Sequence, residues 1–78
     1  MQNTVELVKQ FFINIDRADI DENMENLLSE DIIDSMDIMS LVAEIEKFYK
    51  KPLKAEFIKA ENFESFHTIK NMIEQAMR

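Results

Sequence analysis

The chain has 78 residues, no cysteine, and 16 acidic against 9 basic side chains, for a net charge of -7. A chain of this length forms one domain with a small core, so we do not expect a deep catalytic cleft. The charge disfavours nucleic acid and anionic membranes as partners and favours basic proteins, while the lack of cysteine excludes disulfides and thiolate metal sites.

Hydrophobic residues recur at helical rather than alternating spacing along the chain, which contains no glycine and one proline. We predict one all-α domain over residues 1–78: a bundle of three main helices plus one short helix, with a long loop between the first two. The first helix is predicted over residues 4–15, where Asn3 and Glu6 have the spacing of a capping box. Its apolar face comprises Val5, Leu7, Val8, Phe11, Phe12 and Ile15.

Residues 16–34 are polar and acidic, and we expect them to form the long loop. Loops of this length in small domains are usually functional or packed by their own side chains. The apolar residues expected to anchor it to the core are Ile20, Leu27, Leu28, Ile32 and Ile33.

The second main helix is predicted over residues 35–50, with Asp34 as its N-cap, Asp37 in its first turn and Pro52 after its end. Its inward stripe comprises Ile38, Leu41, Val42, Ile45 and Tyr49. A short helix is predicted over residues 54–59, and the last helix over residues 66–77, capped by Ser65. The apolar face of the last helix comprises Phe66, Ile69, Met72, Ile73 and Met77.

The start of the second helix carries the motif of most interest. Asp34, Ser35 and Met36, preceded by Ile33, look like the Asp-Ser-Leu attachment motif of the phosphopantetheine-dependent acyl carrier proteins. The likeness continues along the helix through Asp37, Ile38, Met39, Ser40, Leu41, Val42, Ala43, Glu44, Ile45 and Glu46. It resumes before the last helix at Glu61, Asn62, Phe63, Glu64 and Ser65. The chain thus resembles the discrete acyl, peptidyl or D-alanyl carriers.

This resemblance implies an acyl-carrier-type bundle in which a 4′-phosphopantetheine arm from coenzyme A is attached to Ser35. The arm would carry an acyl or aminoacyl group as a thioester, and the chain itself would be no enzyme. The implied partners are a phosphopantetheinyl transferase, a loading ligase, and downstream synthases or transferases. Residues 1–15 lack the features of a signal peptide, so we expect a cytoplasmic monomer without membrane insertion.

Enzymes read such carriers through the second helix, and the resemblance implies which residues they would contact. These partner-recognition residues are Asp34, Met36, Asp37, Met39 and Ala43, with Glu44 and Glu46 adding charge. The alternative for Met36 and Met39 is packing in the core, and the alternative for the acids is plain solvated surface.

Some positions depart from the usual carrier pattern. Asp31 stands where many discrete carriers have glycine, and Ser40 and Lys47 stand where fatty-acid carriers often have glutamate. Lys54 and Lys59 also make the short-helix region less acidic. These departures favour a specialised pathway, polyketide or nonribosomal, over fatty-acid synthesis; a D-alanyl carrier for cell-wall polymer modification is the alternative.

The sequence also allows functions of other classes. Asp19, Asp21, Asn23 and Glu30 fall at positions 1, 3, 5 and 12 of a calcium-binding EF-hand loop, but Met24 occupies the position that needs glycine. A hydrolase or transferase with Ser35 as nucleophile would require His67, the one histidine, as its base. An acidic helical adaptor without a cofactor is the remaining alternative.

Overall fold

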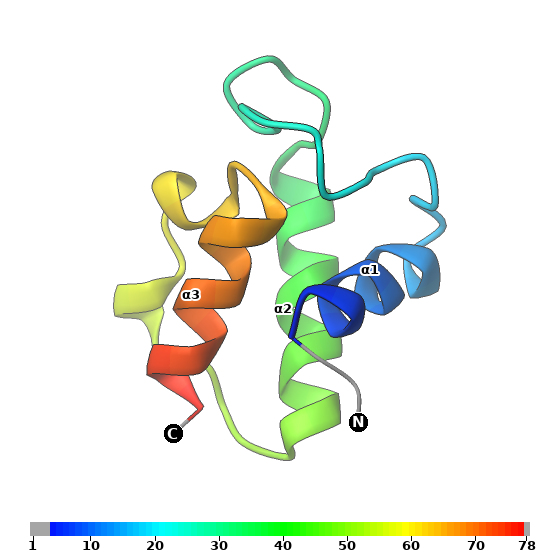
Figure 1. The fold of residues 1–78 in the computed structure, drawn as a ribbon. Helices are drawn as coiled ribbons and strands as arrows, with labels where there is room; N and C mark the ends of the chain where they lie inside the picture. The colour runs from blue at the N-terminus through cyan, green and yellow to red at the C-terminus, as the bar shows by residue number, and fades with distance from the viewer. Residues whose placement is uncertain (1–3, 78) are drawn as a thin grey trace.

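The computed structural model describes residues 4–77, which form three α-helices and two short 3₁₀-helices, with no strand among them. The bounds are Thr4–Asn14 for α1, Ser35–Tyr49 for α2, Ala55–Phe57 for η1, Ala60–Phe63 for η2 and Phe66–Ala76 for α3. In Figure 1, α2 and α3 both run from the top of the view to the bottom, and α1 lies across α2. α1 packs against both of the other helices. The predicted all-α bundle with a long first loop is confirmed, although the short-helix region extends further and contains two 3₁₀-helices.

Caps define the ends of the helices close to where the sequence predicts them. Asp34 caps α2 and Ser65 caps α3, each through a reciprocal capping box with the residue three positions later. α2 ends at Tyr49 because Lys50 adopts a left-handed conformation, with φ of 55°, so the helix stops before Pro52. The capping role predicted for Asn3 lies outside the described residues.

One hydrophobic core joins the three helices and the loops. Its buried members are Leu7, Val8, Phe11, Phe12, Ile20, Leu27, Ile33, Leu41, Val42, Ile45, Leu53, Phe63, Phe66, Ile69, Met72 and Ile73. Phe12 of α1 stacks on Phe66 of α3, with ring centroids 5.2 Å apart. Leu53 and Phe63 were not predicted as core residues; they lie in the connection after α2, where no helical periodicity marks an inward face.

The long loop is anchored to the core through three buried residues, Ile20, Leu27 and Ile33. The backbone of Leu27 joins the loop to two other segments. Its N–H donates to the Glu64 carbonyl at 2.9 Å, and its carbonyl accepts from the N–H groups of Ile32 and Ile33 at 2.8 and 3.0 Å. Leu28 and Ile32 are partly buried against the core. The prediction that apolar side chains anchor the loop is therefore confirmed. These contacts fix the position of the loop up to Ile33, next to the start of α2.

Candidate functional site

Ser35 is the first residue of α2 and is exposed to solvent. Among the described residues, its hydroxyl has no hydrogen-bond partner, and the backbone N–H groups of Ser35 and Met36 have no acceptor. Unsatisfied N–H groups at the start of a helix favour an anion placed beside them. The site therefore combines an accessible hydroxyl with backbone N–H groups that favour an anion.

The two carboxylates flanking Ser35 are held by the capping box of α2. Asp34 Oδ1 accepts a hydrogen bond from the backbone N–H of Asp37 at 3.0 Å, and Asp37 Oδ2 accepts one from the N–H of Asp34 at 3.2 Å. Asp34 remains exposed, whereas the side chain of Asp37 is only 20% exposed. The capping role predicted for Asp34 is confirmed, and Asp37, predicted only as a carboxylate in the first turn, completes the capping box.

Arg17 connects the beginning and the end of the loop to this capping box. Its Nη1 lies 2.6 Å from Asp37 Oδ2, and its Nη2 donates to the Ile32 carbonyl at 2.6 Å. On its other side, Nε lies 3.2 Å from Asp19 Oδ1. The sequence pattern does not predict a site role for Arg17. The one signal in the sequence is that Arg17 is one of only two basic residues within the acidic residues 1–34.

Charge pairing shifts two of these groups. The hydrogen bond from Arg17 lowers the pKa of the Asp19 carboxyl below its ordinary value. The same bond, with the nearby charges of Asp37, Asp19 and Asp34, raises the pKa of the Arg17 guanidinium. Both groups stay charged at neutral pH, so the pairing persists across the physiological range.

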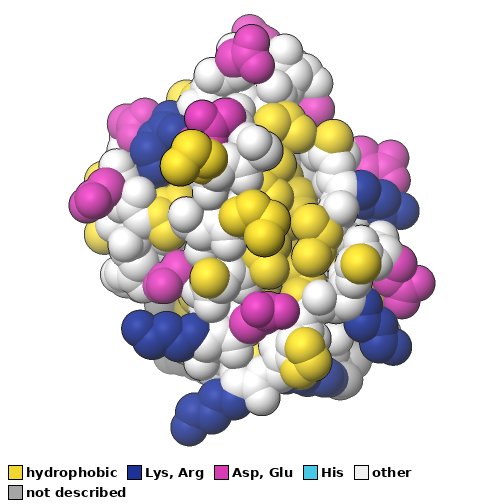
Figure 2. All heavy atoms as spheres, turned by 180° about the vertical axis from the view of Figure 1, so that it is seen from behind, with side chains coloured by type: hydrophobic (Ala, Val, Ile, Leu, Met, Phe, Trp, Pro, Cys, Tyr) yellow, Lys and Arg dark blue, Asp and Glu magenta, His cyan; other side chains and the backbone are white. Residues whose placement is uncertain are grey.

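Met36 and Met39 are the most exposed large hydrophobic side chains among the described residues, at 77% and 61%. The alternative that they pack in the core is wrong. Asp34 and Ala43 are exposed as well, so these four predicted recognition residues are open to a partner. Figure 2 shows hydrophobic side chains gathered in the middle of one face, with both acidic and basic side chains around them.

Glu44 and Glu46, predicted to add charge to the recognition surface, have contacts within the chain. Glu44 Oε1 accepts a hydrogen bond from Asn14 Nδ2 of α1 at 2.9 Å. Glu46 Oε2 accepts one from the backbone N–H of Leu53 at 2.8 Å, which secures the turn after α2. Both side chains are partly buried, so each also has a structural role that helical spacing alone does not reveal.

The EF-hand alternative has no support in the geometry of residues 19–30. Asp19 pairs with Arg17, and Asp21 Oδ1 accepts a hydrogen bond from the backbone N–H of Asn23 at 2.9 Å. Within residues 4–77, no group of three or more His, Asp or Glu side chains is placed to hold a metal ion. Met24 packs against the core, which further separates this loop from a cation-binding turn.

The nucleophile alternative requires a base beside Ser35. His67 lies in the first turn of α3 and is exposed, and among the described residues no hydrogen bond joins it to Ser35. A serine nucleophile is activated by a base within hydrogen-bonding distance. Ser35 and His67 therefore do not form a hydrogen-bonded pair in the part of the chain that the structure describes.

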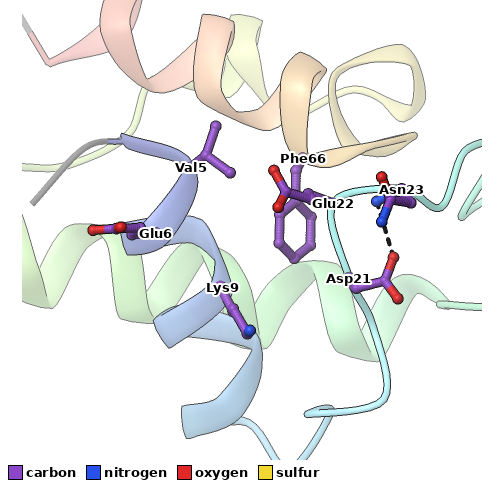
Figure 3. Close-up of a pocket in the computed structure, with 7 residues that line it drawn as sticks. All are labelled: Val5, Glu6, Lys9, Asp21, Glu22, Asn23 and Phe66. Atoms are coloured by element: carbon purple, nitrogen blue, oxygen red, sulfur yellow. Dashed lines mark hydrogen bonds between the residues drawn. The ribbon is translucent and has the colours of Figure 1, made fainter.

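Two surface pockets lie away from Ser35. One, of about 370 Å³, is shown in Figure 3 and is lined by Val5, Glu6, Lys9, Asp21, Glu22, Asn23 and Phe66. The second, of about 330 Å³, lies between α1 and α2 and is lined by Phe11, Asn14, Glu44, Lys47 and Phe48. Ser35 lines neither of these two pockets.

Comparisons with protein-family models, curated proteins and solved structures give no significant match to this chain. Of the helices in residues 4–77, none combines the length and apolar character that crossing a membrane requires.

Proposed function

We propose that this chain is an acyl carrier protein that carries an acyl or aminoacyl group on a 4′-phosphopantetheine arm attached to Ser35. The observation that supports this most directly is the exposed hydroxyl of Ser35 at the first position of a capped helix. The motif formed by Asp34, Ser35 and Met36 supports the same function through its resemblance to the carrier family.

In the proposed modification, Ser35 Oγ attacks the phosphorus of coenzyme A that bears the pantetheine. A new Oγ–P bond forms as the P–O bond of the diphosphate linkage breaks. Adenosine 3′,5′-bisphosphate leaves, and the serine proton passes to a base of a separate phosphopantetheinyl transferase. The attached arm supplies a terminal thiol for thioester formation, which this chain, having no cysteine, lacks.

The residues around Ser35 fit a negatively charged phosphodiester. The unsatisfied N–H groups of Ser35 and Met36 favour an anion at the start of α2. The nearby carboxylates of Asp34 and Asp37 both accept hydrogen bonds, and Asp37 is paired with Arg17. This pairing reduces the repulsion that two free carboxylates would exert on the phosphodiester.

The proposed contact surface for partner enzymes is formed by Asp34, Met36, Met39 and Ala43, which are exposed around and after Ser35. Exposed methionines suit a surface that several enzymes must recognise, because their flexible side chains adapt to different partners. The partners would be the transferase, a loading ligase and downstream enzymes. The exposed Lys47 on the same helix supports a specialised biosynthetic pathway rather than fatty-acid synthesis.

The test is incubation of the purified chain with coenzyme A and a broad-specificity phosphopantetheinyl transferase, followed by measurement of the intact mass. The unchanged chain should gain the mass of one phosphopantetheine, and Ser35→Ala should gain none. Ser40→Ala is the matched control, because Ser40 is also exposed on α2 and its loss should leave the modification intact. No gain of mass by the unchanged chain would overturn the proposed function.

A further inference from the structure

Ser35 lies between two points of the chain that are held by one side chain. Arg17 donates to the Ile32 carbonyl, three residues before Ser35, and pairs with the Asp37 carboxylate, two residues after it. Both distances are 2.6 Å, slightly shorter than the roughly 2.7–2.9 Å that is usual for hydrogen bonds from a charged N–H donor. The loop therefore joins α2 through a contact that spans the serine.

Two hydrogen bonds fix the backbone of Arg17. Its backbone N–H donates to the carbonyl of Phe12 at 2.8 Å, and its carbonyl accepts from the N–H of Ile20 at 3.2 Å. Phe12 and Ile20 are both buried in the core. The backbone of Arg17 is thus held against the close-packed core, and its guanidinium contacts the first turn of α2 from this fixed position.

The contacts use the planar shape of the guanidinium and not only its charge. Nη1 and Nη2 point to two different acceptors, Asp37 and the Ile32 carbonyl, while Nε and Nη2 also face the carboxylate of Asp19 at 3.2 and 3.3 Å. A lysine ammonium is a point charge on a flexible stem and does not reproduce this fork. The side chain of Arg17 is only 25% exposed, which limits screening by solvent.

We propose that Arg17 is the positioning residue that presents Ser35 to the modifying transferase, an inference that rests on the proposed carrier function. Arg17 acts through Asp37 and the Ile32 carbonyl, which hold the two flanks of the serine in place before the enzyme binds. When this contact is lost, the enzyme must order residues 32–37 on binding, so recognition weakens while the chemical step is preserved.

The experiment measures transferase kinetics for the unchanged chain, Arg17→Gln, Arg17→Lys and Lys9→Gln. Lys9 is the matched control, because it is exposed and is the other base in the acidic residues 1–34. Both glutamine variants change the net charge equally. All four chains are assayed at a temperature at which circular dichroism shows each to be folded.

We expect Arg17→Gln to raise the KM for the carrier chain about three- to tenfold with little change in kcat, and Arg17→Lys to recover only part of the loss. Amide hydrogen exchange at residues 32–37 should quicken in Arg17→Gln and not in Lys9→Gln. If the two glutamine variants have equal KM values, or if Arg17→Lys is fully active, the positioning role is wrong although the carrier function stands. If the unchanged chain is not modified, the carrier function fails, and the role of Arg17 with it.

Discussion

Glu64 Oε1 lies 2.9 Å from the backbone nitrogen of Leu28, 36 residues earlier in the chain. The same oxygen accepts from the N–H of Ser29 at 3.0 Å, and Oε2 is hydrogen-bonded to the Ser29 hydroxyl. Together with the bond from Leu27 to the Glu64 carbonyl, these contacts fasten the long loop to the segment before α3. Glu64 thus secures the loop at one point, as Arg17 does at another.

Replacing Glu64 should loosen the loop. Glu64→Ala leaves the N–H groups of Leu28 and Ser29 without their acceptor, so the melting temperature should fall. Glu64→Gln keeps an acceptor oxygen, so its melting temperature should fall less than that of Glu64→Ala. Glu56→Ala, at an exposed position in η1, is the control and should melt close to the unchanged chain in circular dichroism. Equal melting temperatures for all four chains would show that the Glu64 contacts add no stability.

Glu64 also predicts how stability depends on pH. Its hydrogen bonds, first of all that from the Ser29 hydroxyl, lower the pKa of its carboxyl from the ordinary 4.5. A pKa that is lower in the folded than in the unfolded chain adds stability above the unfolded value, and this stability is lost as the pH falls through the folded value. The contribution is therefore complete at neutral pH and declines below about pH 4.5.

Thermal melts of the unchanged chain and Glu64→Gln between about pH 3 and pH 7 measure this contribution. The difference in melting temperature between them should shrink as the pH falls below about 4.5. Asp19, whose pKa is also lowered, is retained in both chains, so its contribution cancels in the comparison. A difference that stays constant over the whole range would contradict the role assigned to the Glu64 charge.

Asp31 occupies the left-handed region of backbone conformation, with φ of 57°. Its side chain tolerates this conformation better than most residues do, and its N–H donates to the Leu28 carbonyl at 3.1 Å. Asp31→Ala should cost about 1 kcal/mol in the free energy of unfolding. Asp31→Gly should be tolerated, because glycine adopts positive φ without a steric penalty.

Urea unfolding followed by circular dichroism measures these effects, with Glu30→Ala as the control. Glu30 is exposed and adjacent, but it is not among the residues with positive φ. An equal cost for Asp31→Ala and Glu30→Ala would contradict the claim that backbone conformation decides the preference at residue 31.

Met36 and Met39 should matter for recognition and not for stability. Because both side chains are mostly exposed, replacing either with alanine should change the free energy of unfolding by less than about 0.5 kcal/mol. The rate of modification by the transferase should nevertheless fall. A normal rate in the double variant Met36→Ala with Met39→Ala would show that the contact surface lies elsewhere.

Leu27 should behave in the opposite way to the exposed methionines. It is fully buried although it belongs to the loop, so Leu27→Ala should cost about 2–5 kcal/mol in the free energy of unfolding. Leu28→Ala, at a partly buried neighbour, should cost less. Urea unfolding of the two variants measures both losses. Similar small losses for Leu27→Ala and Leu28→Ala would show that the loop only covers the core and is not part of it.

The sequence by itself was sufficient to predict the helices, the N-caps of α2 and α3, and most of the core. Helical periodicity reports which face turns inward, and the side chains of Asp34 and Ser65 cap their helices through bonds to residues only three positions away. The exposed Ser35 at the start of α2 follows from the same local pattern. These features depend on neighbours in the chain, so the order of residues is enough to locate them.

Only the tertiary structure showed which charged residues near the candidate site contact other parts of the chain. Arg17 contacts the Asp37 carboxylate, 20 residues later, and Glu64 accepts from the backbone N–H of Leu28, 36 residues earlier. The positions of these residues in the sequence do not specify either partner. The buried positions of Leu53 and Phe63 likewise depend on how the segment after α2 returns across the core. Contacts between distant segments exist only once the helices have packed, and for that reason the partner of each charge had to be read from the fold.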